Sequence, residues 1–260
     1  MNYSVLDYQK EDSVAIVTLN RPESLNALNK KVFDELGLIF DEIEKDYSIK
    51  VVLLTGSGKK AFAAGADVTE IRHLSPLEAR KYALEAYQTQ DKISGLPKPT
   101  VAVLNGLTLG GGCELAMCCD LRIASDTAKL GQPEINLALI PGGGGTQRLC
   151  RLIGESRAKE LLFTGKIISA KQALEWGLVN RVFPQENLMA ESLKFAREIA
   201  GKSSPALELI KAAANRGINM DLKNALLYEI ECFGSCFNTE DHLEGISALL
   251  EKRKPIFLDK

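Results

Sequence analysis

The sequence has few residues of the kinds that hold metal ions or build disulfide frameworks. It contains only two histidines, His73 and His242, and none of its six cysteines forms a C-x-x-C pair. A structural zinc site needs closely spaced cysteine or histidine pairs, so we expect no metal site. A disulfide framework is not expected in a chain of this size without a secretory signal. We expect reduced cysteines packed as small apolar side chains.

Long apolar runs and an excess of positive charge are also missing. No apolar run approaches the roughly 20 residues that span a bilayer. Residues 1–12 lack the basic segment and apolar segment of a signal peptide. We therefore expect a cytoplasmic protein with no membrane partner. The 32 basic and 34 acidic residues give a net charge of −2, which is unlike the basic surface of a nucleic-acid-binding protein. No nucleic-acid partner is expected.

Strand-like and helix-like segments alternate as far as about residue 185. Short β-rich runs predict strands at 14–19, 51–55, 100–104, 121–124, 128–131 and 179–183. Apolar residues at helical spacing, or a short apolar run after a glycine cluster, predict helices at 32–43 (with Asn29 as a candidate cap), 76–93, 113–119 and 146–153.

Helices dominate the rest of the chain. Apolar spacings of three and four predict them at 169–176, 187–200, 204–216, 221–236 and 240–252. The pattern indicates an α/β core followed by a helical part. We place the core at residues 1–197 and the helical C-terminal region at 198–260, with a soft boundary because no low-complexity linker separates them.

One glycine pattern resembles a nucleotide-binding motif but lacks its context. Gly56-Ser57-Gly58 follows the strand at 51–55 and fits the start of G-x-G-x-x-G/A. That motif requires a helix to begin at once, so that its N-terminus meets the pyrophosphate. Residues 61–69 are instead predicted to form a loop of small residues, and a surface turn is the better interpretation. No G-x-S-x-G motif points to a serine nucleophile, and both histidines are expected to be exposed polar residues.

A second glycine cluster, Gly110–Gly112, immediately precedes Cys113 and Glu114 at the start of a predicted helix. Free backbone N–H groups at such a helix start can bind an anion or an oxyanion. Glu114 would lie in the first helical turn beside them. The same glycines could instead serve only close packing, with Glu114 as a favourable first-turn charge.

A second acidic candidate is Glu134, which stands between Pro133 and the apolar stretch 135–140. A carboxyl group in such surroundings is expected to be partly buried, which raises its pKa. A raised pKa suits a proton donor near neutral pH. An ordinary loop glutamate is the alternative, since the chain has 34 acidic residues.

Several motifs, taken together, resemble the crotonase, or enoyl-CoA hydratase/isomerase, superfamily over nearly the whole chain. They include Asn20-Arg21-Pro22, the segment 61–67, Gly110–Ala116, Gly131–Glu134 and Pro141–Leu149. The resemblance implies an α/β fold that is a spiral of β-β-α turns, with C-terminal helices used for trimer contacts. It implies a homotrimer or a homohexamer.

The resemblance also implies a binding site for an acyl-CoA thioester. By motif position, the N–H groups of Ala66 and Gly111 would hold the thioester oxygen. The loop from Ala64 to Thr69 would line the coenzyme A, so the expected substrate-binding residues are Ala64, Ala66, Asp67, Val68, Thr69 and Gly111. Coenzyme A is part of the substrate, and no metal or separate cofactor is implied.

Two glutamates distinguish the hydratases within this superfamily. Glu114 and Glu134 stand 20 positions apart (134 − 114), each in its expected motif. The implied activity is reversible hydration of short-chain trans-2-enoyl-CoA, with Glu114, Glu134, Ala66 and Gly111 as catalytic residues. An enoyl-CoA isomerase or acyl-CoA hydrolase of the same fold is the alternative, and a non-catalytic acyl-CoA-binding or RNA-binding protein a remote one. Chain length and pathway are not fixed by the sequence.

Overall fold

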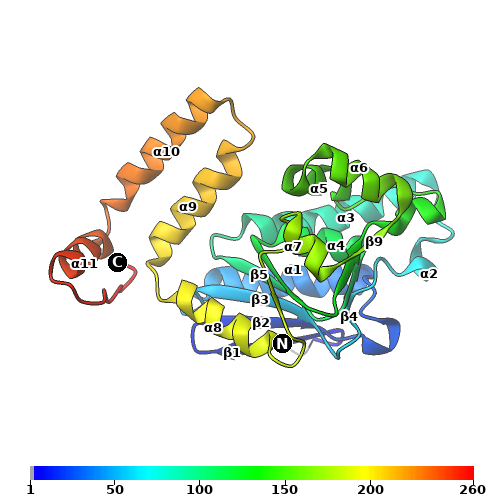
Figure 1. Ribbon diagram of the computed structural model, residues 1–260, viewed down its shortest axis with the longest axis horizontal. Coiled ribbons are helices and arrows are strands. Elements are labelled where there is room, and N and C mark those ends of the chain that lie inside the picture. Colours follow the sequence, from blue (N-terminus) through cyan, green and yellow to red (C-terminus); the bar gives the residue numbers. More distant parts are fainter. Residues whose placement is uncertain (1–2) are drawn as a thin grey trace.

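Two β-sheets form the centre of the molecule in the computed structural model, which describes residues 3–260 (Figure 1). The larger sheet has the order β1-β2-β3-β5-β7-β10 and the smaller one β4-β6-β8-β9. The strands are β1 Leu6–Glu11, β2 Val14–Leu19, β3 Val51–Gly56, β4 Ala61–Ala63, β5 Thr100–Leu104, β6 Leu107–Leu109, β7 Leu121–Ser125, β8 Lys129–Gly131, β9 Ile167–Ser169 and β10 Arg181–Phe183.

Helices follow the strands and cover the sheets. They are α1 Lys30–Lys45, α2 Val68–Ile71, α3 Pro76–Gly95, α4 Gly111–Cys118, α5 Gly145–Ile153, α6 Glu155–Thr164, α7 Ala170–Glu175, α8 Leu188–Ala200, α9 Ser204–Gly217, α10 Leu222–Cys236 and α11 Glu240–Leu250, with 3-10 helices η1 Pro22–Ser24 and η2 Pro133–Leu137. Among the residues from 3 to 260, no helix is long and apolar enough to cross a membrane.

The strand order produces a spiral of β-β-α turns. Strands β3, β5 and β7 lie parallel in the larger sheet, and each continues after a turn into a strand of the smaller sheet, β4, β6 and β8 respectively. A helix then returns the chain to the larger sheet. The predicted α/β spiral is therefore confirmed. Both sheets are mixed, because β1 and β9 are antiparallel to their neighbours.

The core lies on both faces of the larger sheet. Val52 and Leu54 of β3 pack into one apolar cluster, with α1 and α4, whereas Val51 and Leu53 pack into a second one beneath α8. Two buried faces explain why the central parallel strands are continuously apolar. Among the described residues, neither cluster includes a residue beyond Ala200.

Local sequence signals account for the long helices. The predicted cap Asn29 accepts a hydrogen bond from Val32 N at 3.0 Å, and the apolar stripe of α1 is buried. Ser75 and Glu78 form a capping box at the start of α3, with Pro76 in its first turn.

Helices α9, α10 and α11 extend away from the sheets (Figure 1). They expose many large apolar side chains, including Ile218, Phe233 and Leu249. The division at residue 197 into a core and a helical region stays a prediction.

Several short elements differ from the prediction. The segment 61–69 was expected to be a loop, but it contains β4 and the start of α2. The helix expected from residue 113 begins at Gly111, and residue 169 ends strand β9 rather than starting a helix. Strands β1, β6 and β9 and helix α6 were not predicted. Three-residue strands are too short to show a hydrophobic period, and β1 is largely polar.

The glycine turn at Gly56–Gly58 does not open a helix. It leads into strand β4, and the Asn105 side-chain amide donates to the carbonyls of Gly56 and Gly58, both at 2.8 Å. A nucleotide-binding turn would require a helix start at this point. The interpretation as a surface turn is confirmed, since residues 58–60 are exposed.

Candidate active site

The start of helix α4 requires glycine at two positions, Gly110 and Gly112. Gly110 has φ +50° and ψ −125°, a conformation that L side chains rarely adopt. A Cβ atom on Gly112 would lie 2.1 Å from the Ala63 carbonyl oxygen, so α4 packs directly against β4. This contact fixes the helix start and the N–H of Gly111 beside the loop that follows β4.

The N–H groups of Ala66 and Gly111 lie close together. Leu28 N donates to Gly65 O at 2.8 Å and Asp67 N donates to Leu28 O at 2.7 Å, which fixes the peptides on each side of Ala66. A Cβ on Gly111 would lie 3.4 Å from Ala66 N, so Gly111 lies directly against the Ala66 peptide. Within residues 3–260 neither N–H has a protein acceptor. The pair can therefore donate to one oxygen of a ligand.

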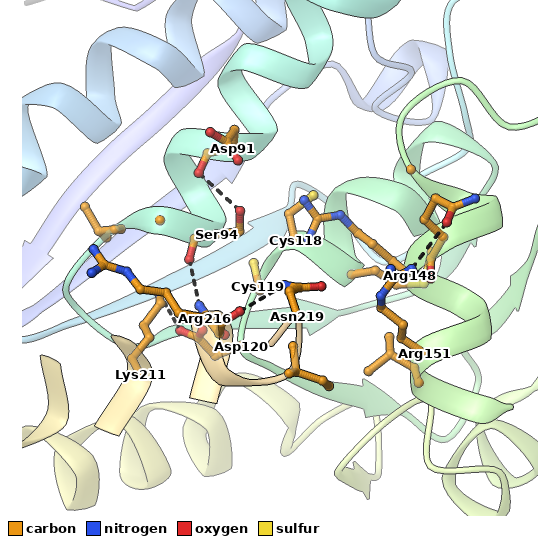
Figure 2. Close-up of a pocket in the computed structure, with 18 of the residues that line it drawn as sticks. Asp91, Ser94, Cys118, Cys119, Asp120, Arg148, Arg151, Lys211, Arg216 and Asn219 are labelled. Atoms are coloured by element: carbon orange, nitrogen blue, oxygen red, sulfur yellow. Dashed lines mark hydrogen bonds and ion pairs between the residues drawn. The ribbon is translucent and has the colours of Figure 1, made fainter. Parts of the chain in front are cut away.

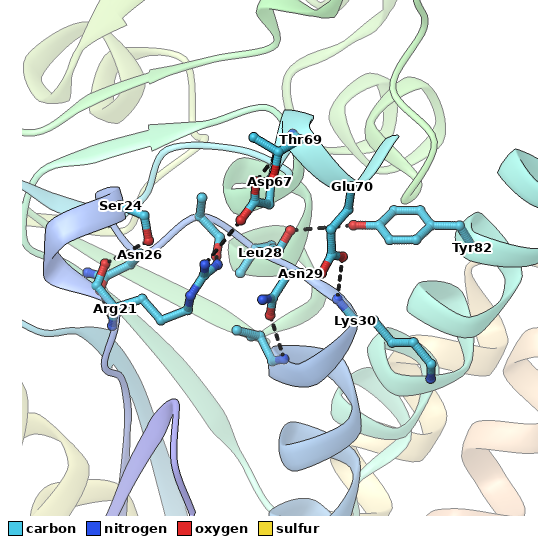
Figure 3. Close-up of polar contacts among 12 residues, drawn as sticks. Arg21, Ser24, Asn26, Leu28, Asn29, Lys30, Asp67, Thr69, Glu70 and Tyr82 are labelled. Atoms are coloured by element: carbon cyan, nitrogen blue, oxygen red, sulfur yellow. Dashed lines mark hydrogen bonds and ion pairs between the residues drawn. The ribbon is translucent and has the colours of Figure 1, made fainter. Parts of the chain in front are cut away.

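A polar network holds the loop that carries Ala66 (Figure 3). Arg21 Nη2 lies 3.1 Å from Asp67 Oδ2, and Arg21 Nη1 donates to Ala27 O at 2.6 Å. Thr69 Oγ1 donates to Asp67 Oδ1 at 2.6 Å. The Thr69 hydroxyl, together with Arg21, lowers the pKa of Asp67. The Asp67 carboxylate thus stabilises the loop, while Ala64 is half-buried and Val68 and Thr69 are exposed at its surface.

Glu114 lies one turn into α4, with only 4% of its surface exposed. Its Oε1 accepts hydrogen bonds from Gly143 N and Gly145 N, each at 2.7 Å. Burial raises the pKa of Glu114, and the two N–H groups and the Arg148 cation oppose that shift. The carboxylate is consequently buried with its Oε1 oxygen bonded and its Oε2 oxygen without a protein donor among the described residues.

Glu134 lies in η2, on the other side of Gly110. A Cβ on Gly110 would lie 3.0 Å from Glu134 Oε1 and 3.7 Å from Gly65 Cα, which places this carboxyl beside the Gly65–Ala66 loop. Burial, together with the negative charge of Glu114, raises the pKa of Glu134 to about 7. The raised pKa that the sequence predicted is confirmed.

The physical reason given for burying Glu134 was wrong. The apolar stretch 135–140 does not cover it, because Ile135, Leu137, Leu139 and Ile140 are between 43% and 76% exposed. Glu134 is enclosed instead by the turn at Gly110 and by Gln132. In the amide orientation that satisfies both of its polar groups, the Gln132 nitrogen donates to the two Glu134 oxygens at 2.9 and 3.1 Å.

The structure brings four of the predicted residues into one site: Ala66, Gly111, Glu114 and Glu134. Sequence reasoning missed Gly143 and Gly145, whose N–H groups hold Glu114, and the buried Gln132. The glycine run 142–145 was interpreted only as a turn. The histidines are not in the site, since His73 is exposed and His242, half-buried, contacts Thr239 O in the C-terminal region.

A cavity of about 920 Å³ (Figure 2) includes Gly143 and Gly144 in its lining. Side chains of α3, α4, α5 and α9 line it, with Arg148 and Arg151 on one wall. Lys211 of α9 crosses to Asp120 at 2.8 Å, which ties α9 to the core. The described lining of this cavity does not include Ala66, Gly111, Glu114 or Glu134. The cavity is therefore separate from the paired carboxyls.

Comparison with known proteins finds relatives over nearly the whole chain. Residues 9–260 match the family model for enoyl-CoA hydratase/isomerase. The chain is 46% identical to the short-chain-enoyl-CoA hydratase of Clostridium acetobutylicum, over 95% of this chain and 94% of that protein. It is 45% identical to the crotonyl-CoA hydratase of Syntrophomonas wolfei over the full length of both.

A solved structure, the enoyl-CoA hydratase from Bacillus anthracis, superposes with a TM-score of 0.95 at 40% identity, covering 99% of this chain and 100% of that one. In sequence and in fold, the chain belongs to the enoyl-CoA hydratase/isomerase family.

Proposed function

We propose that the protein is an enoyl-CoA hydratase, a hydro-lyase that reversibly adds water across the C2=C3 bond of short-chain trans-2-enoyl-CoA to give 3-hydroxyacyl-CoA. The observation that supports it most strongly is the pair of carboxyls beside two free N–H groups. The identity of about 45% to a short-chain-enoyl-CoA hydratase and a crotonyl-CoA hydratase supports the same reaction and substrate. Such reactions belong to fatty-acid metabolism.

The N–H groups of Ala66 and Gly111 bind the thioester oxygen. That oxygen gains negative charge when water adds at C3, since the electrons of the double bond move toward the carbonyl. Two fixed donors stabilise the charge without reorganising, and one such donor is worth about 10²–10³ in rate. The positive end of α4 adds to the stabilisation.

The two glutamates divide the proton transfers. Glu114 accepts a proton from the attacking water, whose oxygen bonds to C3. Glu134 donates its proton to C2. Because one glutamate gains a proton and the other loses one, the number of protons on the pair does not change. A pKa of about 7 for Glu134 leaves a large fraction of it protonated at neutral pH, as an acid requires.

Coenzyme A lies along the loop from Ala64 to Thr69, and it is part of the substrate rather than a separate cofactor. The peptide groups of Ala64 and Ala66 and the accessible residues Val68 and Thr69 offer backbone and side-chain contacts to it. The Asp67 carboxylate contributes through Arg21 and Thr69 by holding the loop.

The protein assembles as a homotrimer or a homohexamer. Helices α9–α11 and the η2–α6 surface each expose apolar side chains that a monomer would leave in water. Two different patches suit a head-to-tail contact, which closes into a ring. They comprise Ile210, Ile218, Leu226, Leu227, Ile230, Phe233, Phe237, Leu243, Ile246, Leu249 and Leu250 on the helices, and Ile135, Leu137, Leu139, Ile140 and Phe163 on the core. The cytoplasmic location stays a prediction.

The activity is tested with crotonyl-CoA. The absorbance of the conjugated enoyl thioester should fall rapidly, and mass spectrometry should identify 3-hydroxybutyryl-CoA. Release of free coenzyme A would indicate a hydrolase instead. Conversion of 3-enoyl-CoA without hydration of crotonyl-CoA would indicate an isomerase. If the folded protein causes no loss of absorbance with crotonyl-CoA or with longer enoyl-CoAs, the proposal is refuted.

A further inference from the structure

Gln90 is a buried polar residue for which the reaction as described has no role. It lies on the inner face of α3 with 1% of its surface exposed. Within residues 3–260 its Oε1 has no hydrogen-bond partner. The other buried residues of that face are the apolar Ala86 and Ile93, and Thr89, which donates to Phe33 O at 3.2 Å. A buried amide without partners is costly, so its presence calls for a reason.

The missing side chain of Gly143 leaves room for this amide beside Glu114. A Cβ on Gly143 would lie 2.7 Å from Gln90 Nε2 and 2.8 Å from Glu114 Oε2. Because both atoms lie within 2.8 Å of one point, they are at most twice that distance, 5.6 Å, apart. A small side-chain movement, or a single water molecule, joins atoms at such a separation.

Glu114 therefore has two unlike oxygens. Its Oε1 is held by Gly143 N and Gly145 N at 2.7 Å, which makes that oxygen the less basic one. Its Oε2 lies within 5.6 Å of Gln90 Nε2 and has no protein donor among the described residues. The proton taken from water accordingly goes to Oε2.

We propose that Gln90 is a positioning residue for hydration, whose amide holds the Oε2 oxygen of Glu114 in the orientation that receives the proton of the attacking water. The inference rests on the proposed function. As one O–H bond of the water breaks, its oxygen bonds to C3 and its proton moves to Oε2, while the Glu134 proton moves to C2. An amide serves both states of Glu114, because its N–H donates to the carboxylate and its oxygen accepts from the carboxylic acid.

The other charged groups near Glu114 come from different elements. Arg148 lies on α5 and Glu134 on η2, while the buried thiols of Cys113 and Cys118 lie on α4 itself. Gln90 is neutral, so removing its amide leaves all of these charges in place. A change in the titration of Glu114 would then report the lost hydrogen bond.

Gln90→Met tests the proposal, since methionine keeps the size of the side chain and removes the amide. Gln88→Met, on the exposed side of the same helix, is the matched control. With crotonyl-CoA we expect kcat to fall about tenfold with KM changed less than about twofold. The acid limb of the kcat/KM profile should move to higher pH, because loss of the donor raises the pKa of Glu114.

Unchanged kcat and an unchanged pH profile in Gln90→Met, with or without a lower melting temperature, would overturn the proposal. If that variant does not fold, Gln90→Asn keeps an amide but withdraws it from Glu114 by one methylene group. It should lower kcat about tenfold, whereas Gln88→Asn should not. Equal rates for these two variants would also overturn the proposal. A wild-type protein inactive on every enoyl-CoA would refute the proposed function instead.

Discussion

The surroundings of Glu114 and Glu134 differ although the two residues share one site. Glu114 is almost fully buried, and backbone N–H groups of a glycine turn fix one of its oxygens. Glu134 is half-buried on a five-residue 3-10 helix, where Gln132 is its neighbour. Burial raises the pKa of both, but the two N–H groups oppose the shift at Glu114 alone.

The difference explains how one residue type supplies both a base and an acid. Hydrogen bonds from Gly143 and Gly145 favour the carboxylate of Glu114, which suits a group that accepts a proton. Glu134 lacks backbone donors from other segments and faces the negative charge of Glu114, so it keeps a proton more readily. Surroundings that push two pKa values apart assign the acid and the base.

The largest effect should come from removing either carboxyl. Glu114→Gln and Glu134→Gln should each lower kcat for crotonyl-CoA by about 10³-fold, within the range of general acid–base catalysis. Glu186→Gln, at an exposed position, should keep wild-type turnover. If either site variant retained full activity, that carboxyl would have no part in the chemistry. The two glutamates could then not be the base and the acid.

A smaller loss should follow from blocking the N–H pair that serves both glutamates. Gly111→Pro removes the N–H at the first residue of α4, a position where proline is compatible with a helix. We expect kcat/KM to fall about 10²-fold, the typical value of one such donor. Gly95→Ala places its Cβ in open space and should behave as wild type. Similar activity for Gly111→Pro and Gly95→Ala would contradict the role of this pair.

The pH profile sharpens the comparison. Hydration needs Glu134 protonated and Glu114 ionised, so the pair must hold one proton. Since the pKa of Glu134 is raised to about 7, kcat/KM should fall as the pH rises through about 7. Glu134→Gln should lose this limb along with most of its activity. A wild-type profile that is flat from pH 6 to pH 9 would contradict the assignment of the acid.

The smallest expected effect is on stability. The folded-state pKa of Glu134 lies above its model value of 4.5, so its contribution is present below about pH 4.5 and is lost as the pH rises through about 7. Glu134→Gln should therefore stabilise the fold at pH 8 by about 1 kcal/mol, after discounting the shift for partial exposure. Urea unfolding at pH 8 and pH 5, at one protein concentration, should show the gain only at pH 8. An equal gain at both pH values would show that ionisation is not its cause.

The sequence predicted the long elements of the fold because their patterns are long. The stripe of α1 and the fully buried strand β3 contain enough apolar residues to show a period or a continuous run. Strands β6 and β9 have three residues each, and contacts with neighbouring strands define them. No local signal marks these two strands.

In the candidate site, too, local patterns were predictable from the sequence and long-range contacts were not. The family motifs indicated Glu114, Glu134 and Gly111 as site residues, and their roles stay predictions. The bonds from Gly143 and Gly145 to Glu114 join positions 29 and 31 residues apart, which no local pattern indicates. Gln90 lies on α3 with no motif around it, and only the packing shows that its amide nitrogen lies within 5.6 Å of Glu114 Oε2.

Deuterium exchange at C2 of butyryl-CoA tests the division of labour most directly. This saturated thioester has no C2=C3 bond to hydrate, so exchange in D₂O requires only the N–H pair and a base at C2. Wild type and Glu114→Gln should both incorporate deuterium at C2, by mass spectrometry or NMR, while Glu134→Gln should not. Exchange that persists in Glu134→Gln and disappears in Glu114→Gln would contradict the account.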